Sequence, residues 1–271
     1  MASGGERGGK PMASARRSSV WLEGGTPRSV RSRKAEQPSG LDRDRITGAA
    51  VRLLDAEGLA KFSMRKLAAE LNVTAMSVYW YVDTKDDLLE LALDRVMGEL
   101  AAATDPVAAA GATAAPEADW RERLRELATS YRALLVAHPW ASSLLGHFLN
   151  IGPHSMRFAR TVQRVIGDTG LPMHLQTGAM ASVFQFVYGF GTIEGHFRQR
   201  CAEAGMTQDE YFENAMGTIR LRPGYAEDFA QAERMMEARG GDTVGEMRDR
   251  DFHFALDVQI AGIEAMVARG A

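Results

Sequence analysis

The chain has 271 residues and a formal net charge of −3, with 45% hydrophobic and 25% charged residues. This is the composition of an ordinary globular protein. The length suits one large or two smaller domains, with enough core to need no disulfide or metal for stability. The single cysteine, Cys201, excludes a disulfide framework within the chain and favours a reducing compartment, which we expect to be the cytoplasm.

Basic residues are concentrated at the start of the chain. Residues 1–40 carry eight lysines and arginines against three glutamates. Residues 1–10 lack the apolar core of a signal peptide. The only substantial apolar pair of residues 1–40, Trp21-Leu22, is too small to offset the entropy of ordering. We therefore expect a disordered basic tail. One interpretation is a solubilising tail, and another is a misassigned start codon, with translation beginning at Met12. The third is a basic arm that contacts DNA phosphates or the minor groove.

Beyond residue 40 the apolar residues follow a helical period almost throughout. Ile46, Ala49 and Leu53, for example, lie at i, i+3 and i+7 on one stripe. No sustained alternation with a period of two indicates a strand, so the sequence predicts an all-α fold. The uncharged run 170–193 contains a histidine, glutamines and glycines that disfavour membrane insertion. We expect a buried helix there and no association with a membrane.

Residues 63–82 have the pattern of a helix-turn-helix. Ser63 can cap a first short helix, and Thr74 can cap a second one. Ala68 is small enough for two helices to cross at a steep angle, and Asn72 tolerates the positive φ that the tight turn between them requires. In such a motif the second helix enters the major groove of DNA.

Residues 41–100 closely resemble the DNA-binding domain of the tetracycline-repressor (TetR) family. The resemblance covers the helix before the motif, the motif itself, the Tyr79-Trp80 pair and the start of the next helix at Lys85. It implies an N-terminal three-helix DNA-binding domain in a homodimeric transcriptional regulator, in the first place a repressor, that binds a palindromic double-stranded DNA operator and is released by a small-molecule effector. It assigns DNA contacts to Ser63 and Arg65 in the first helix of the motif, base contacts to Thr74, Ala75, Met76 and Ser77, and phosphate contacts to Tyr79, Tyr81 and Lys85.

Residues 101–116 are mostly small and include two prolines, so we predict a linker. Residues 117–267 resemble, more loosely, the C-terminal domain of the tetracycline-repressor branch, which implies that 117–271 form a helical effector-binding and dimerisation domain. The stretches His174 to Phe197 and Asp251 to Val267 resemble the helix pair that forms a four-helix dimer interface in this family. The alternative for the first stretch is a core helix that packs within the chain.

Aromatic and polar residues of the C-terminal domain are mixed as they are in ligand cavities. Tetracycline repressors hold the drug and its magnesium with polar and histidine ligands, but the matching positions here are Ala101, Leu127 and Leu145. We therefore expect neither that site nor any other metal or cofactor, and the effector stays unidentified. The candidate effector-binding residues, each of which could instead be a core residue, are Tyr131, Trp140, Leu145, His147, Phe148, Phe158, Gln185, Phe186 and Tyr188.

The sequence lacks the signatures of catalysis that we sought. It contains no HExxH, no GxSxG and no paired cysteines at metal spacing. Gly189, Gly191 and Gly195 give GxGxxxG, which is one residue off the dinucleotide fingerprint and follows no strand. We therefore expect a regulator and not an enzyme. Two alternatives stay open: a DNA-binding protein that responds to no effector, and a helical small-molecule-binding protein or enzyme whose motif is incidental.

Overall fold

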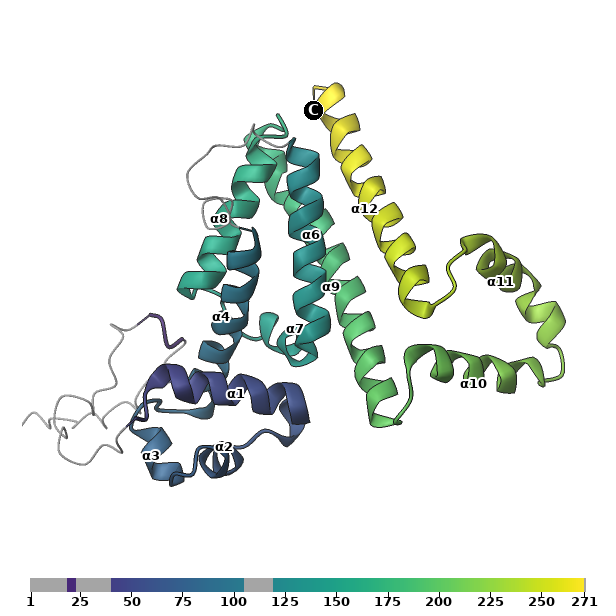
Figure 1. Cartoon of the computed structure of the whole chain (residues 1–271). Coiled ribbons are helices and arrows are strands. Elements are labelled where there is room, and N and C mark those ends of the chain that lie inside the picture. Colours follow the sequence, from purple (N-terminus) through teal and green to yellow (C-terminus); the bar gives the residue numbers. More distant parts are fainter. Residues whose placement is uncertain (1–18, 23–39, 105–118, 271) are drawn as a thin grey trace, which may run out of the picture.

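The computed structural model describes residues 19–22, 40–104 and 119–270, and every regular element within these ranges is a helix. The predicted all-α fold is therefore confirmed (Figure 1). In chain order the elements are α1 (Arg43–Glu57), the 3₁₀ helix η1 (Leu59–Lys61), α2 (Met64–Glu70), α3 (Ala75–Tyr79), α4 (Lys85–Thr104), α6 (Trp120–Ala137), α7 (Pro139–Leu145), α8 (Pro153–Gly167), α9 (Met173–Glu203), α10 (Gln208–Arg220), α11 (Tyr225–Arg239) and α12 (Val244–Ala268).

Helices α1, α2 and α3 form a head at one end of the molecule, and the first turns of α4 complete it (Figure 1). The two short helices begin where the sequence predicts. Ser63 Oγ accepts a hydrogen bond from the backbone N–H of Lys66, and Thr74 Oγ1 accepts one from that of Ser77. The apolar faces of these helices meet in one core, whose fully buried side chains include Ile46, Leu54, Leu67, Val78 and Val82.

Helix α4 leaves the head and runs into the body, where it packs against α6 and α8 (Figure 1). It begins with a reciprocal cap, in which the Asp87 N–H donates to Thr84 Oγ1 at 3.0 Å and the Thr84 N–H donates to Asp87 Oδ2 at 3.1 Å. The helix continues to Thr104, into the stretch 101–116 that was predicted to be a linker, because its alanines favour helix. The predicted linker therefore starts with a helical turn, and residues 105–116 lie outside the described residues.

Helices α6, α8 and α9 form the core of the C-terminal domain, and α7 lies beside the head (Figure 1). The backbones of α6 and α9 approach closely because α9 presents glycines to α6. A Cβ on Gly191 would lie 3.0 Å from Leu135 Cβ, and one on Gly195 would lie 2.7 Å from the Leu135 carbonyl oxygen. One face of α9 is therefore a core face within the chain. None of the described helices combines the length and apolar character needed to span a bilayer.

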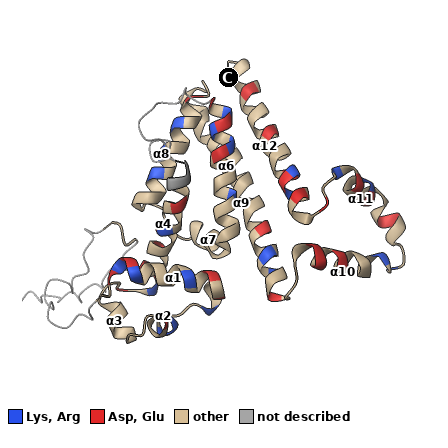
Figure 2. Ribbon diagram, in the orientation of Figure 1, with Lys and Arg blue, Asp and Glu red and all other residues tan. Residues whose placement is uncertain are grey.

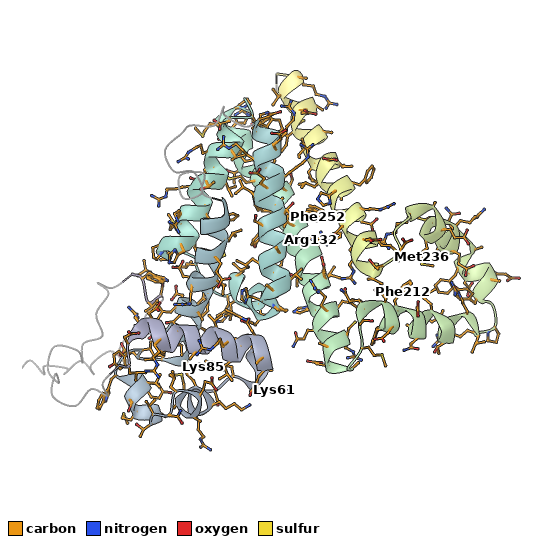
Figure 3. All side chains as sticks on the ribbon, in the orientation of Figure 1. Lys61, Lys85, Arg132, Phe212, Met236 and Phe252 are labelled. Carbon is orange, nitrogen blue, oxygen red and sulfur yellow. The ribbon has the colours of Figure 1, made fainter. Side chains whose placement is uncertain are left out.

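Helices α10 and α11 form an arm that extends from the body between the end of α9 and the start of α12 (Figure 1). A capping box of Thr207 and Glu210 begins the arm. Figure 3 shows Phe212 and Met236 on its inner side, whereas Leu221, at the bend between the two helices, is 85% exposed. Helix α12 then returns along α9 and ends at Ala268.

Candidate DNA-binding and effector-binding sites

The first turn of α3 presents most of the predicted base-reading residues to solvent. Thr74 is exposed, Ala75 is half-buried and Met76 is 65% exposed. These side chains are short or flexible, so α3 can approach base edges in a major groove closely. Ser77 does not fit the prediction, because it is buried and its hydroxyl lies 2.9 Å from that of Thr74. In this conformation Ser77 faces the head and not a base.

The turn between α2 and α3 fixes how far α3 projects. Asn72 has φ of 54°, the left-handed conformation that the sequence predicted. The Val73 N–H donates to the Ala68 carbonyl oxygen at 2.9 Å, which closes the turn. On the first helix of the motif, Arg65 is exposed, whereas the Ser63 hydroxyl is occupied as the cap of α2. Of the two, Arg65 is therefore the one whose side chain is free to reach a DNA backbone.

The three residues predicted to hold phosphates differ in placement. Tyr79 is 39% exposed at the end of α3. The Tyr81 hydroxyl is buried without a hydrogen-bond partner among the described residues. Lys85 Nζ donates to the Phe62 carbonyl oxygen at 3.1 Å and lies 5.5 Å from the centre of the Phe62 ring, within the head (Figure 3). Of the three, only Tyr79 is placed to reach a phosphate in this conformation.

Two of the candidate effector residues meet in an aromatic cluster between α6, α8 and α9. The ring centroid of Tyr131 lies 5.8 Å from that of Phe158 and 5.9 Å from that of Phe184, and Phe158 and Phe184 are 5.9 Å apart. Burial raises the pKa of the Tyr131 hydroxyl, with a smaller contribution from Tyr188. Phe184 is the member that the sequence reading missed. The uniform apolar pattern of α9 contained no signal that selected it.

The other candidate effector residues do not join this cluster. Phe186 lies on another face of α9 and stacks on Phe252 of α12, with ring centroids 5.6 Å apart. The Tyr188 hydroxyl donates to the Ser142 carbonyl oxygen at 2.8 Å. The remaining members are spread over the domain: Trp140 is buried against the head, Leu145 and Phe148 pack on the edge of the core, and His147 and Gln185 are exposed.

A groove runs between α9 and α12 on the outer face of the body. It has a volume of about 470 Å³, and no candidate effector residue lines it. Figure 2 shows that the charged residues of α9 lie toward the end that meets α10, away from the α9 residues that line the groove. Its lining residues are Leu171, Leu175, Gly178, Ala179, Ser182, Val258, Gln259, Gly262, Ile263 and Met266.

Two parts of the chain match known families. Residues 46–92 match the bacterial regulatory proteins of the tetR family, and residues 113–267 match the tetracyclin repressor-like C-terminal domain. An HTH-type transcriptional regulator from Saccharopolyspora erythraea is 32% identical over 227 residues, which cover 83% of this chain and 85% of that protein. The chain belongs to the TetR family. Its head is the DNA-binding domain of a transcriptional regulator, as the helix-turn-helix pattern predicted.

Other TetR-family proteins show the same organisation. The HTH-type transcriptional repressor DrrR1 from Streptomyces coeruleorubidus is 30% identical over 84% of this chain and 79% of its own. The Streptomyces coelicolor TetR family protein ActR, solved in complex with actinorhodin, is 26% identical in sequence and superposes with a TM-score of 0.64. The match covers 86% of this chain and 100% of the ActR chain. A possible TetR family regulator from Streptomyces coelicolor A3(2) is also 26% identical, with a TM-score of 0.61 over 83% of this chain and 99% of that one.

The positions matched to the drug–magnesium ligands of tetracycline repressors are occupied in this TetR-family protein by side chains that cannot coordinate a metal. Leu127 is 2% exposed in the core, and Leu145 packs against its edge. Ala101 lies in α4 and has a methyl side chain. In the parts of the chain that the structure describes, no three histidine, cysteine or carboxylate side chains gather in a group that could hold a metal.

Proposed function

We propose that this TetR-family protein is a homodimeric repressor that binds a palindromic operator and releases it when a small molecule occupies the C-terminal domain. The observation that carries the proposal is the exposed first turn of α3, which the Asn72 turn holds out from the head. The name of the relative DrrR1 supports repression. We place the protein in the cytoplasm and assign it no catalytic activity.

The apolar groove and its surroundings support a dimer through α9 and α12. Phe254 is 73% exposed and Val258 is 53% exposed on α12, and Ile193 is 70% exposed on α9. Large apolar side chains exposed together on two adjacent helices mark an interaction surface. A second copy that contributes the same two helices would bury these faces in a four-helix interface. It would also set two copies of α3 about 34–36 Å apart, the spacing of successive major grooves.

The aromatic cluster supports an effector site in the body of each protomer. Tyr131 and Phe158 come from α6 and α8, and α8 packs directly against α4, the helix that carries the head. ActR, a TetR family protein of similar structure, was solved with actinorhodin. We therefore infer that the effector inserts between the rings of this cluster. It needs to supply only the free energy by which it prefers the released state, about 1–3 kcal/mol.

Selection of genomic DNA fragments on the purified full-length protein tests DNA recognition. We expect one palindromic fragment to bind with steep salt dependence, because phosphate contacts release counterions. Met76→Ala is expected to change base preference. The matched control is Met235→Ala, since Met235 is 64% exposed on the arm while Met76 is 65% exposed on α3. Random recovery of fragments by the parent protein would contradict the proposal.

The second candidate function is a DNA-binding protein that responds to no effector. The aromatic cluster favours it, because Tyr131 and Phe158 are each 8% exposed and the three ring centroids lie within 5.9 Å of one another, which leaves little room for a ligand. The two functions separate when the selected fragment is titrated with protein in the presence of multi-ring aromatic compounds, actinorhodin among them. Release of the fragment by one compound, with loss of that response in Phe158→Ala, supports the first function. Unchanged binding with every compound supports the second.

A further inference from the structure

A histidine joins the C-terminal domain to the head at the corner where α6 ends. His138 follows the last residue of α6, precedes Pro139 at the start of α7, and is 9% exposed. Its Nδ1 lies 2.7 Å from Asp55 Oδ1, and its Nε2 lies 3.3 Å from Glu99 Oε2. Asp55 is on α1 of the head, and Glu99 is on α4. The ring therefore bridges a carboxylate of the head, on α1, and a carboxylate of α4, the helix that carries the head.

The chemistry of this bridge requires a proton on each ring nitrogen. Ionised carboxylates only accept hydrogen bonds, and a neutral imidazole has a single N–H, so one of its nitrogens would point a lone pair at a carboxylate. Only the imidazolium of His138 can donate to both Asp55 and Glu99. The indole Nε1 of Trp140 also donates to Asp55 Oδ1, at 2.6 Å. The Asp55 carboxylate therefore accepts hydrogen bonds from two side chains of the C-terminal domain, His138 and Trp140.

The surroundings of His138 contain few other charges. Among the described residues, Asp55 on α1 and Glu99 on α4 are the charged groups in contact with the ring. Helix α7 contributes the Trp140 ring, and α9 contributes Gly195 near the adjoining Pro139. Burial lowers the pKa of His138, but the hydrogen bonds and charges of Asp55 and Glu99 raise it by more, so the pKa lies above its ordinary value.

We propose that His138 is a positioning residue for DNA binding, whose protonated ring holds the head in one orientation against the C-terminal domain. Loss of the proton leaves a lone pair facing Glu99, so that contact opens and the head gains freedom about the remaining Asp55 contact. Proton concentration then acts on the same equilibrium of head positions that an effector shifts. This inference rests on the proposed function only for its effect on DNA.

The bridge can be tested in the full-length protein without DNA. We expect the NMR signal of the His138 ring to titrate with a midpoint above about 6.5, the ordinary histidine value. The indole N–H signal of Trp140 is expected to shift with the same midpoint, because both groups bind Asp55 Oδ1. Glu99→Gln, at a largely exposed carboxylate, is expected to lower the midpoint. A midpoint at or below the ordinary value, or one that Glu99→Gln leaves unchanged, would overturn the proposal.

The pH profile of DNA binding tests the consequence, with the fragment from the genomic selection as the probe. We expect its affinity to fall about fivefold as pH rises through the His138 midpoint, because an unrestrained head rarely presents the spacing of two successive grooves. His138→Gln keeps a hydrogen-bonding side chain but cannot titrate, so its profile is expected to lack this step. His196→Gln, at an exposed histidine of α9 outside the bridge, is the matched control and is expected to follow the parent.

The possible outcomes separate the two proposals. If the fall in DNA affinity with rising pH persists in His138→Gln, the role of His138 is overturned and the proposed function stays intact. A parent protein that selects no fragment at any pH overturns the proposed function, while the NMR titration still decides whether the bridge carries a proton.

Discussion

Asp94 closes the first turn of α8 by accepting hydrogen bonds from both the backbone N–H and the hydroxyl of Ser155, each at 2.9 Å. The cap comes from α4, 61 residues away, and not from the residue before α8. That residue is Gly152, which has no side chain to cap the helix. The carboxylate is 4% exposed, so α4 and α8 are joined by a buried contact and not only by apolar packing. A shift of α8 therefore acts directly on the helix that carries the head.

Gly152→Ala is expected to destabilise the protein by about 2 kcal/mol, because the added methyl has no room. A Cβ at this position would lie 2.2 Å from Asp94 Oδ1 and would push the carboxylate off the α8 cap. Gly167→Ala is the matched control at the other end of the same helix, where a Cβ would meet nothing within 4 Å. Denaturant unfolding measures both. Equal stabilities of the two variants would contradict the close contact.

Asn72→Ala is expected to lower the free energy of unfolding by about 1 kcal/mol, because the left-handed conformation at φ of 54° is strained for alanine. Asn72→Gly is the control, since glycine adopts that conformation freely, and we expect it to unfold within a few tenths of a kcal/mol of the parent. The order of the three proteins in urea checks the prediction. An alanine variant as stable as the glycine variant would show that the turn does not depend on this φ.

Local features of the head could be predicted from sequence because each depends on a few neighbouring residues. The caps at Ser63 and Thr74 and the turn at Asn72 are of this kind. The inward placement of Ser77 could not be predicted in the same way. On a helix of only five residues, a shift of one position rotates a side chain by about 100° and exchanges the exposed face for the buried one.

Contacts between distant helices could not be predicted from a single sequence. Helix α9 is apolar on several faces, so its pattern did not separate Phe184, which faces Tyr131, from Phe186, which faces Phe252. His138 directly follows the last residue of α6. Its partner Asp55 lies 83 residues earlier, in another domain, and no local pattern connects the two.

Glu194→Ala is expected to destabilise the protein by about 3 kcal/mol, because it removes the buried one of the two carboxylates, Glu194 and Asp249, that each lie 2.7 Å from the buried Arg132 guanidinium. Arg132 Nε donates to Glu194 Oε2 at 2.7 Å, and both side chains are less than a tenth exposed. The guanidinium also lies 4.7 Å from the centre of the Phe252 ring, and Figure 3 shows the two side chains together between α6 and α12. Glu194→Gln keeps a hydrogen-bond acceptor for Arg132, so we expect it to lose less stability than Glu194→Ala. Thermal unfolding compares the two variants.

Removal of residues 1–22 is expected to destabilise the protein by about 1–3 kcal/mol, whereas removal of residues 1–18 is expected to leave its stability unchanged. Ser19 Oγ and the Val20 N–H donate to Glu90 at 2.5 and 2.8 Å, and Glu90 is 4% exposed on α4. Without residues 19–22 this carboxylate loses both donors. Glu90→Gln in the shorter chain is expected to recover part of the loss, since an amide costs less to leave unpaired than a charge. Equal melting temperatures of the two truncated proteins would contradict the contact.

The thermal stability of the parent protein relative to His138→Gln is expected to be greatest in mild acid. Burial lowers the pKa of His138, but Asp55 and Glu99 raise it more, so the folded pKa lies above the unfolded value of 6.5. A group that binds its proton more tightly in the folded state contributes its full stability below the unfolded pKa and loses it as pH rises through the folded pKa. Melting curves of both proteins between about pH 5.5 and pH 9 are therefore expected to converge at the alkaline end. A difference that grows with pH would mean that the buried ring is held neutral, and that its contacts with the two carboxylates are not charged ones.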